Sequence, residues 1–222
     1  MKLRIRIPEN ISPQAAIALQ KKLAPLVKET SELPARIESL IGCDATYFHG
    51  TTVAAAIRVR YEELKFEAKK LVQEPIKFPY IPGLLAFREA PAVLKAVRAL
   101  RAKSYVCLLD AHGLAHPRRF GLACFVGVAL DQPTVGVAKS LLYGRVSGNR
   151  VLDKQNNPIA EIVTLPISGR RIYVSVGHKI SLRDAVKVVK YCLNSAGPLP
   201  IRLAHEEVTR ERWLIEKLNR AS

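Results

Sequence analysis

One uninterrupted apolar run in the middle of the chain restricts the class of fold more than any other feature. Residues 104–110 read Ser-Tyr-Val-Cys-Leu-Leu-Asp, without the polar alternation of a half-exposed strand. Such a run is typical of a strand that is buried on both faces of a sheet. Residues 134–138, Thr-Val-Gly-Val-Ala, form a second interior run of the same kind. Strands of this type are covered by helices, so the chain is predicted to have an α/β fold.

Three further strand-like runs precede this core. Residues 37–44 are mainly apolar and end in an acid, residues 51–59 are rich in alanine and β-branched side chains, and residues 66–72 alternate with Lys and Glu. Short turn-like joints at 49–50 and 61–63 separate the runs. This spacing predicts an antiparallel meander of three strands.

Helical patterns are interleaved with the strands. Ser12-Pro13 resembles an N-cap followed by proline at the first helical position, and predicts a helix that continues over 14–27. Apolar spacing predicts a helix over 84–102, and a small, apolar stretch at 120–130 is suited to a buried helix.

The C-terminal third adds both kinds of element. Two strand-like runs at 159–165 and 171–176 precede a helix over 181–194, and a last helix is predicted over 204–218, after Pro198 and Pro200. The whole order predicts a ribonuclease-H-like mixed sheet, a three-strand antiparallel meander plus parallel strands, flanked by helices. We expect residues 1–222 to form a single domain of this kind, with an N-terminal helix and C-terminal β/α additions.

The charge balance suggests a polyanionic partner. Lys and Arg number 35 against 19 Asp and Glu, which gives a net charge of +16. Such an excess destabilises a compact chain by self-repulsion and is typical of nucleic-acid-binding proteins. A generally basic or thermophile-like surface is the alternative explanation.

The cysteines and the N-terminus suggest a compartment. Four cysteines lie among apolar neighbours with no Cys-x-x-Cys pair, as expected of buried thiols in a reducing environment. The first seven residues lack the apolar segment of a secretion signal, and no run approaches ~18 apolar residues. We therefore expect a cytoplasmic protein that does not cross a membrane.

Two acids each follow an apolar strand and are the first candidates for chemistry. Asp44 and Asp110 are expected to line a crevice at the carboxyl edge of the sheet, with Glu89 on the intervening helix. Carboxylates that approach one another need a hard cation, and a divalent metal so held can hydrolyse phosphodiesters. For one such aspartate, capping of a turn is the more ordinary explanation; two in a strongly basic chain favour the metal site.

Several motifs resemble those of the endonuclease V family. The longest are Pro79-Tyr-Ile-Pro-Gly-Leu-Leu-Ala-Phe-Arg-Glu89 and the segment from Leu109-Asp-Ala-His-Gly-Leu-Ala-His116 to Pro-Arg-Arg-Phe-Gly121. Shorter matches are Ile41-Gly-Cys-Asp44, Gly136-Val-Ala-Lys139-Ser-Leu-Leu and Ser175-Val-Gly-His-Lys-Ile180. The resemblance covers roughly residues 36–210. It implies a ribonuclease-H-like fold and a DNA-repair endonuclease that uses Mg²⁺, with Mn²⁺ as a possible substitute, and hydrolyses the second phosphodiester bond 3′ to deoxyinosine.

By matching position, the resemblance also implies roles for individual residues. Asp44, Glu89 and Asp110 would bind the metal and act in catalysis, and His116 and Lys139 would lie near the scissile phosphate. Tyr80, with Ile81 and Pro82, would form a wedge that separates the damaged pair; an aromatic held by prolines is stiff, and stacking repays part of the unpairing cost. The pocket for the flipped base would be bordered by Gly83, Leu85, Gly113 and Gly121. An ordinary aromatic in a proline turn and packing glycines are the plainer interpretations.

Two histidines need separate comment. His112 and His116 are four residues apart, but Gly113 and Pro117 indicate a loop, so a helical zinc pair is not expected. His205 departs from the family pattern, in which many members have an aspartate; a neutral histidine can bind a metal but brings no negative charge. The role of His205 as a metal ligand is therefore a hypothesis.

Two rival functions stay open on the sequence. Another ribonuclease-H-like nuclease of the resolvase or integrase type needs the acids but not the Pro-Tyr-Ile-Pro-Gly wedge. A non-catalytic nucleic-acid-binding module needs neither, and predicts that Asp44 and Asp110 are replaceable. DNA with deoxyinosine is the expected partner and inosine-containing RNA a further one, with no obligate protein partner evident.

Overall fold

The computed structural model of the chain describes residues 3–5, 8 and 10–221, with side chains up to residue 217. The expectation that the N-terminus carries no secretion signal therefore lies partly outside the described residues. In the part that is described, no helix is both long enough and apolar enough to span a membrane.

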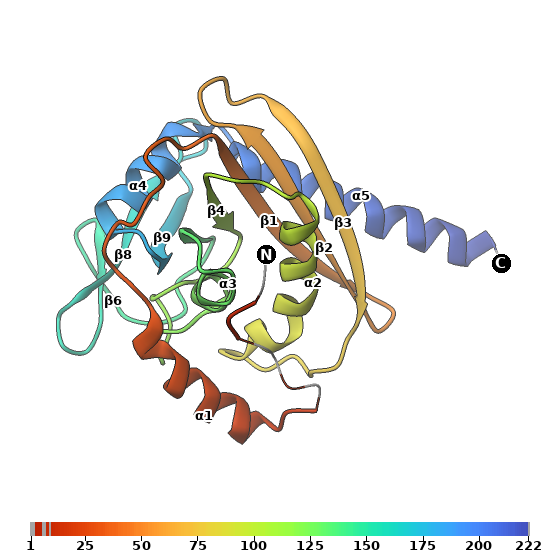
Figure 1. Cartoon of the computed structure of the whole chain (residues 1–222), viewed down its shortest axis with the longest axis horizontal. Helices are drawn as coiled ribbons and strands as arrows, with labels where there is room; N and C mark the ends of the chain where they lie inside the picture. Colours follow the sequence, from red (N-terminus) through yellow and green to blue (C-terminus); the bar gives the residue numbers. More distant parts are fainter. Residues whose placement is uncertain (1–2, 6–7, 9, 222) are drawn as a thin grey trace.

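A single large mixed sheet organises the molecule (Figure 1). Its strand order is β3-β2-β1-β4-β5-β9-β8-β7-β6. The strands are β1 (Ser39–Phe48), β2 (Thr51–Arg60), β3 (Phe66–Pro75), β4 (Tyr105–Leu109), β5 (Thr134–Ala138), β6 (Arg145–Ser147), β7 (Arg150–Leu152), β8 (Pro158–Thr164) and β9 (Arg171–His178). The pairs β1–β4 and β4–β5 are parallel and all others in this sheet are antiparallel. This is the predicted meander plus parallel strands, so the predicted fold class is confirmed.

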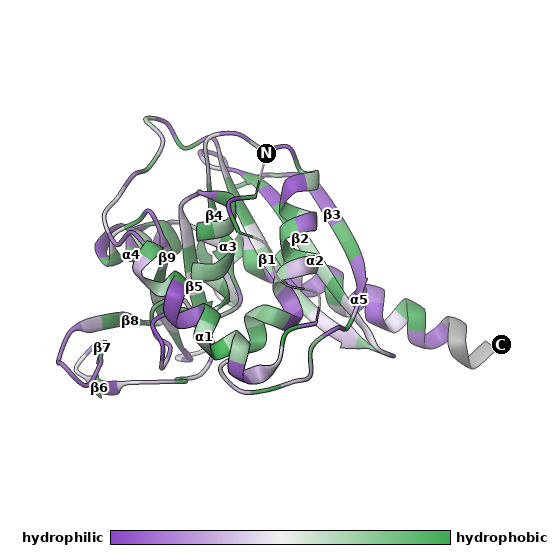
Figure 2. Ribbon diagram, turned by 60° about the horizontal axis from the view of Figure 1, so that its bottom comes forward, coloured by the Kyte–Doolittle hydropathy of each residue, from purple (hydrophilic) through white to green (hydrophobic). Residues whose placement is uncertain are grey.

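Helices cover both faces of the sheet. They are α1 (Pro13–Leu23), which continues into the 3₁₀ helix η1 (Ala24–Leu26), α2 (Leu85–Ala99), α3 (Leu122–Leu130), α4 (Leu182–Tyr191) and α5 (Leu199–Ala221). The short strands β10 (Leu193–Asn194) and β11 (Gly197–Pro198) form a separate hairpin before α5. Helices α2 and α3 pack on one face, whereas α5 packs on β1 and β2 from the other and extends beyond the sheet (Figures 1 and 2).

The core follows from the residue patterns. All nine residues of α3 are buried, and its Phe125 contacts Phe87 and Phe120 at ring-centroid distances of 5.9 Å. On β2, Ala54 and Ala56 face the core with α2, while Ala55 and Ile57 face α5. Alternate residues of a strand point to opposite faces, so this strand is covered on both sides.

Turns and caps follow the expected chemistry. Ser12 caps α1 by accepting a hydrogen bond from the Ala15 amide at 3.2 Å, and Ser181 caps α4 through the Asp184 amide at 3.1 Å. His49 and Gly50 join β1 to β2 with φ values of 40° and 74°. Positive φ at both positions is what a two-residue hairpin turn of the I′ type requires.

Two predicted boundaries are wrong. Strand β1 does not end at Asp44 but continues to Phe48, because residues 45–48 pair with the N-terminal half of β2. Helix α5 begins at Leu199 rather than at Ala204, since Pro200 lies in its first turn, where a missing N–H costs nothing. The hairpin of β6 and β7 was not predicted.

Candidate active site

The two aspartates meet where the parallel pairing of β1 and β4 stops. The last paired residues are Cys43 and Leu109, and the Asp110 amide still donates to the Cys43 carbonyl at 3.0 Å. Asp44 and Asp110 are therefore at the same level of two neighbouring parallel strands. Beyond this level β1 pairs only with β2, which opens the edge of the sheet beside the carboxylates.

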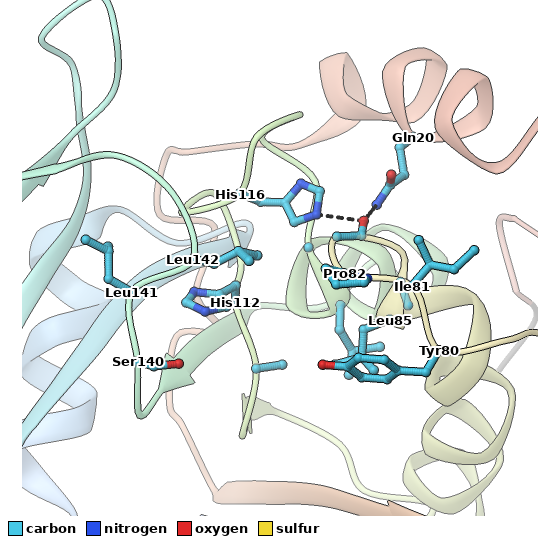
Figure 3. Close-up of a pocket in the computed structure, with 15 residues that line it drawn as sticks. Gln20, Tyr80, Ile81, Pro82, Leu85, His112, His116, Ser140, Leu141 and Leu142 are labelled. Carbon is cyan, nitrogen blue, oxygen red and sulfur yellow. Dashed lines mark hydrogen bonds between the residues drawn. The ribbon is translucent and has the colours of Figure 1, made fainter. Parts of the chain in front are cut away.

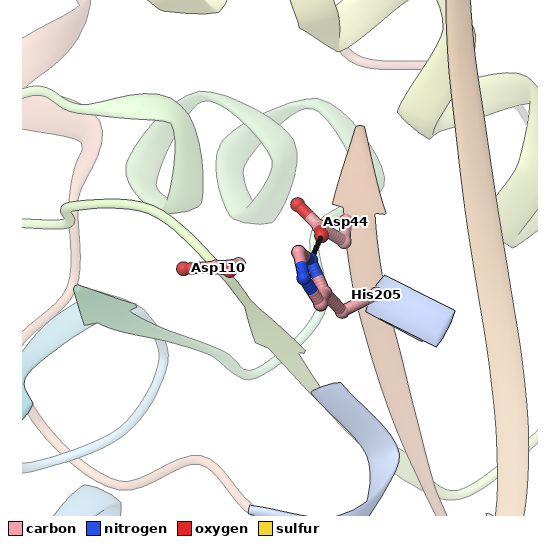
Figure 4. Close-up of side chains that lie close together, drawn as sticks. All are labelled: Asp44, Asp110 and His205. Carbon is pink, nitrogen blue, oxygen red and sulfur yellow. Dashed lines mark hydrogen bonds and ion pairs between the residues drawn. The ribbon is translucent and has the colours of Figure 1, made fainter. Parts of the chain in front are cut away.

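Helix α5 adds a third side chain to this group (Figure 4). His205 Nδ1 lies 2.7 Å from Asp44 Oδ2. One potential ligand atom from each of Asp44, Asp110 and His205 lies within 4.8 Å of the others. We call these three residues the acidic group. His205 could join the group only because α5 crosses the far face of β1.

The electrostatics of the acidic group call for a positive partner. Burial raises the pKa of Asp44, and the nearby Asp110 raises it further, whereas the hydrogen bond from His205 lowers it. Lys139, from the end of β5, forms an ion pair with Asp110 at 2.6 Å between Nζ and Oδ2. The two carboxylates supply the oxygen ligands that Mg²⁺ and Mn²⁺ prefer, and His205 adds one neutral nitrogen. The donor set therefore fits a hard divalent cation.

Glu89 lies close to the acidic group but is not one of its three members. Its side chain is buried on α2 and accepts a hydrogen bond from the Tyr47 hydroxyl. Burial raises the pKa of Glu89 to about 8, and the charges of Asp44 and Asp110 act in the same direction. The Arg88 guanidinium lies over the Tyr47 ring at 4.1 Å. Tyr47 was not predicted, and its spacing gave no signal: three residues after Asp44 on the same strand, its side chain lies on the opposite face of the sheet, towards Glu89 of α2.

A pocket of about 250 Å³ is lined in part by residues that directly follow Asp110. Its side chains are drawn in Figure 3. Its lining includes the predicted Tyr80, Ile81, Pro82, Gly83, Leu85 and Gly121. Ala111 and His112 follow Asp110 directly, so the pocket and the acidic group share the end of β4, and Ser140 follows Lys139, the ion-pair partner of Asp110. Tyr80 stands at this pocket with 66% of its surface exposed. This volume suits a ligand smaller than a drug-sized molecule.

Gly113 is not among the residues that line the pocket. A Cβ at this position would lie 2.0 Å from the Val176 carbonyl oxygen, and its amide donates to Ser175 Oγ at 2.9 Å. Gly113 thus lets the loop after β4 pack directly against β9. Gly121 does line the pocket and also packs tightly, because a Cβ there would lie 2.2 Å from the His112 carbonyl oxygen.

The two histidines belong to the pocket. His116 is buried, its Nδ1 accepts from the Arg118 amide at 3.2 Å, and its Nε2 lies 2.9 Å from the Gly83 carbonyl oxygen. Both ring nitrogens are thus used in the pocket wall rather than in the acidic group, and burial lowers the pKa of His116 to about 4. His112 Nδ1 is buried and has no hydrogen-bond partner among the described residues. The segment is a loop, as predicted.

Gln20 also lines the pocket and was not predicted. It comes from α1, remote in sequence from every motif. The signal available in the sequence was a glutamine on the same side of the helix as Ala16 and Leu23, which are buried with it.

Comparison with known proteins gives one consistent family. The sequence model of the endonuclease V family matches residues 21–206. Endonuclease V of Desulfurococcus amylolyticus is 40% identical over 201 residues, covering 86% of this chain and 91% of the relative. The Thermus thermophilus protein is 37% identical over 215 residues, covering 91% and 95%.

Solved structures agree. The endonuclease V structure from Streptomyces avermitilis superposes with a TM-score of 0.85 at 30% identity, covering 98% of this chain and 100% of that one. Endonuclease V of Ciona intestinalis, solved with a DNA that contains an inosine followed by a ribo-adenosine, gives a TM-score of 0.82 at 28% identity, covering 90% and 97%.

Proposed function

Since this chain belongs to the endonuclease V family and is therefore an endonuclease, we propose that it nicks DNA beside deoxyinosine with Mg²⁺ as cofactor. The proposed cut is at the second phosphodiester bond 3′ to the damaged base. The observation that carries the proposal is the placement of a base-sized pocket directly beside two convergent aspartates.

The acidic group is the proposed metal site. Asp44, Asp110 and His205 would bind the cation. Glu89, hydrogen-bonded to Tyr47, would act next to this site. When bound, the cation supplies a Lewis acid next to the scissile phosphate. Lys139 keeps 64% of its side chain exposed while paired with Asp110. Its amine would turn to a phosphate oxygen once the cation neutralises that carboxylate.

The pocket is the proposed site of the flipped base. Tyr80 would occupy the space that the extruded base leaves, and a mismatched base costs less to extrude. Hypoxanthine presents O6 and N1–H, which backbone groups around Gly83 and Gly121 could read at close range. The unpartnered Nδ1 of His112 adds one polar atom to this set.

All of these groups come from one chain. The main core cluster runs from α1 to α4, which supports a single working domain over residues 1–222. Membership of the family, together with the Pro79–Gly83 loop at the pocket, argues against a resolvase or integrase.

The direct test uses end-labelled duplexes with and without one inosine, incubated in Mg²⁺ or in EDTA. We expect one nick at the second phosphodiester bond 3′ to inosine, one nucleotide past the damaged base, in Mg²⁺ only. Cutting of both duplexes alike would contradict the proposal. A matched set of inosine-containing RNA strands would show whether RNA is also a substrate.

Substitution of the acids separates catalysis from binding. We expect Asp44→Ala and Asp110→Ala to abolish nicking while DNA binding is largely retained, since both residues face the cation rather than the polyanion. Nicking assays and gel-shift titrations of the same preparations measure the two quantities. Substantial Mg²⁺-dependent nicking by either variant would favour a non-catalytic role for the acidic group.

A further inference from the structure

We propose that Gln20 is a positioning residue for damaged-base recognition: with Arg118 it fixes the Gly83 carbonyl, and so holds the wedge loop, residues 79–83, at the pocket. This inference rests on the proposed function of that loop. The family match begins at residue 21, so the family comparison assigns nothing to Gln20.

One carbonyl oxygen gathers three donors. The Gly83 oxygen accepts from Gln20 Nε2 at 3.1 Å and lies 2.9 Å from His116 Nε2 (Figure 3). It also accepts from Arg118 Nη2 at 2.6 Å. Since His116 Nδ1 accepts from the Arg118 amide, its Nε2 carries the proton and donates. The donors come from α1 and from the loop that follows β4, so one backbone atom ties three chain segments together.

Gln20 is fully buried and its whole amide is used. Nε2 also donates to the Phe120 carbonyl at 2.9 Å, and Oε1 accepts from Arg118 Nε at 2.6 Å. A reversed amide would set Oε1 against two carbonyl oxygens, so these neighbours determine its orientation. A buried, fully bonded amide network of this kind fixes geometry more than it adds stability.

The wedge loop needs such an anchor. Tyr80 is 66% exposed, so packing holds its ring only weakly. Within the loop, the described backbone hydrogen bonds include one turn, from the Leu84 amide to the Ile81 carbonyl at 2.9 Å. Gly83 itself has a φ of +79°, which a residue with a side chain rarely adopts. A wedge that must separate a base pair has to be stiff, and here the stiffness comes from the carbonyl at its C-terminal end.

The test compares Gln20→Met, Gln20→Glu and Gln14→Met. Methionine removes all bonds at similar volume. Glutamate keeps an acceptor for Arg118 but loses both donor bonds. Gln14 is exposed on the same helix and serves as the matched control. Two quantities are measured: kcat/KM on inosine and adenine duplexes, and amide hydrogen exchange over residues 79–85 of the free protein.

Both Gln20 variants should lower the inosine-to-adenine preference by about tenfold or more and speed up exchange in residues 79–85. Exchange in α3 and the Mg²⁺ concentration for half-maximal nicking should stay unchanged. A general loss of folding stability would instead change the exchange in α3 as well. Because Gln20 and Arg118 act on one carbonyl, Gln20→Met and Arg118→Lys should be non-additive.

Unchanged preference in both Gln20 variants, or unchanged exchange over 79–85, would overturn the inference. Faster exchange across the whole protein would also overturn it, because Gln20 would then be a general core residue. If the unmodified protein nicks neither duplex, the proposed function fails. The exchange measurement still decides in that case whether Gln20 holds the loop.

Discussion

Asp44 and Tyr80 represent two different ways in which a residue is tied to the fold. Asp44 is fixed by strand register and is largely buried, whereas Tyr80 projects from a loop into solvent. Substitutions at the two positions should therefore affect different quantities, one the chemistry and the other the choice of substrate.

We expect Tyr80→Ala to weaken the preference for inosine over adenine while the metal requirement stays as it is. An exposed side chain that leaves no cavity changes the free energy of unfolding by about 0.5 kcal/mol or less. Nicking rates on the two duplexes at several Mg²⁺ concentrations, with urea unfolding as the control, measure both effects. An unchanged preference would reject the wedge.

His116 makes the stability dependent on pH. Burial lowers the pKa of its ring from 6.5 to about 4. The His116 ring is thus protonated below about pH 6.5 in the unfolded chain, but only below about pH 4 in the folded protein. The contribution of His116 to the free energy of unfolding is therefore fully present above pH 6.5. It is lost as the pH falls from 6.5 through 4, by about 3 kcal/mol in all.

The measurement is urea unfolding at pH 7.5 and pH 5, compared with His116→Gln. The raised pKa of Glu89 gives a slope of the opposite sign between pH 4.5 and 8, so the difference between the two proteins is the informative quantity. The loss of stability on acidification should be smaller in the variant. Equal losses would show that the ring is not held neutral.

For single residues, the sequence predicted which residues belong to the site better than it predicted the contacts that hold them. Asp44 and Asp110 were predictable because two acids each follow an apolar run in a strongly basic chain, and the structure brings them together as expected. Gln20 could not be predicted, because its partners are backbone carbonyls far along the chain, which leave no pattern of side chains. Gly113 and His116 were recognised by motif, but packing against β9 and the bond to Gly83 decide their positions.

At the scale of elements, α5 decides whether the acidic group is complete. It reaches β1 closely because Gly42 has no side chain: a Cβ there would lie 2.0 Å from the backbone of Pro200. The sequence alone predicts too late a start for this helix, since a proline is compatible both with a break and with the first turn of a helix. The predicted boundaries of α1, α2 and α3 were closer, because α1 and α2 have apolar spacing near the helical period and α3 is apolar throughout.

We expect Gly42→Ala to push α5 away from β1 and to separate His205 from Asp44. The clash is with backbone, so it cannot be relieved by a rotamer, and overpacking of this kind costs about 1–3 kcal/mol. Nicking should fall at saturating Mg²⁺, and the Mg²⁺ requirement should rise. Ala45→Gly, one residue past the aspartate, is the control. A normal Mg²⁺ requirement in Gly42→Ala would show that α5 does not set the site.

At the scale of the whole molecule, positive charge surrounds a negative centre. The net charge is +16, yet the acidic group lies on the sheet edge. Next to it, Arg170, Arg171 and Arg202 line a cavity that also includes Asp110 and Lys139. In the proposed function, these arginines would hold the polyanion while the carboxylates hold the cation. Composition alone predicted the polyanion, but the separation of the two charges needed the fold.

This arrangement predicts strongly salt-dependent binding that is independent of the lesion. If about six phosphates are neutralised, the affinity for duplex DNA should fall about a thousandfold between 50 and 200 mM salt. Asp110→Ala prevents nicking during the titration.

The added changes Arg170→Ala and Arg171→Ala test which cations are responsible. They should reduce the magnitude of the slope of log affinity against log salt by about 0.9 for each phosphate that is then left without a cation. Arg36→Ala, whose guanidinium is paired with Glu62 in another cavity, is the control and should leave the slope unchanged. If the double substitution of Arg170 and Arg171 leaves the slope unchanged, the DNA strand does not pass over these arginines. The DNA backbone would then reach the acidic group from the side of Arg212 and Trp213 on α5.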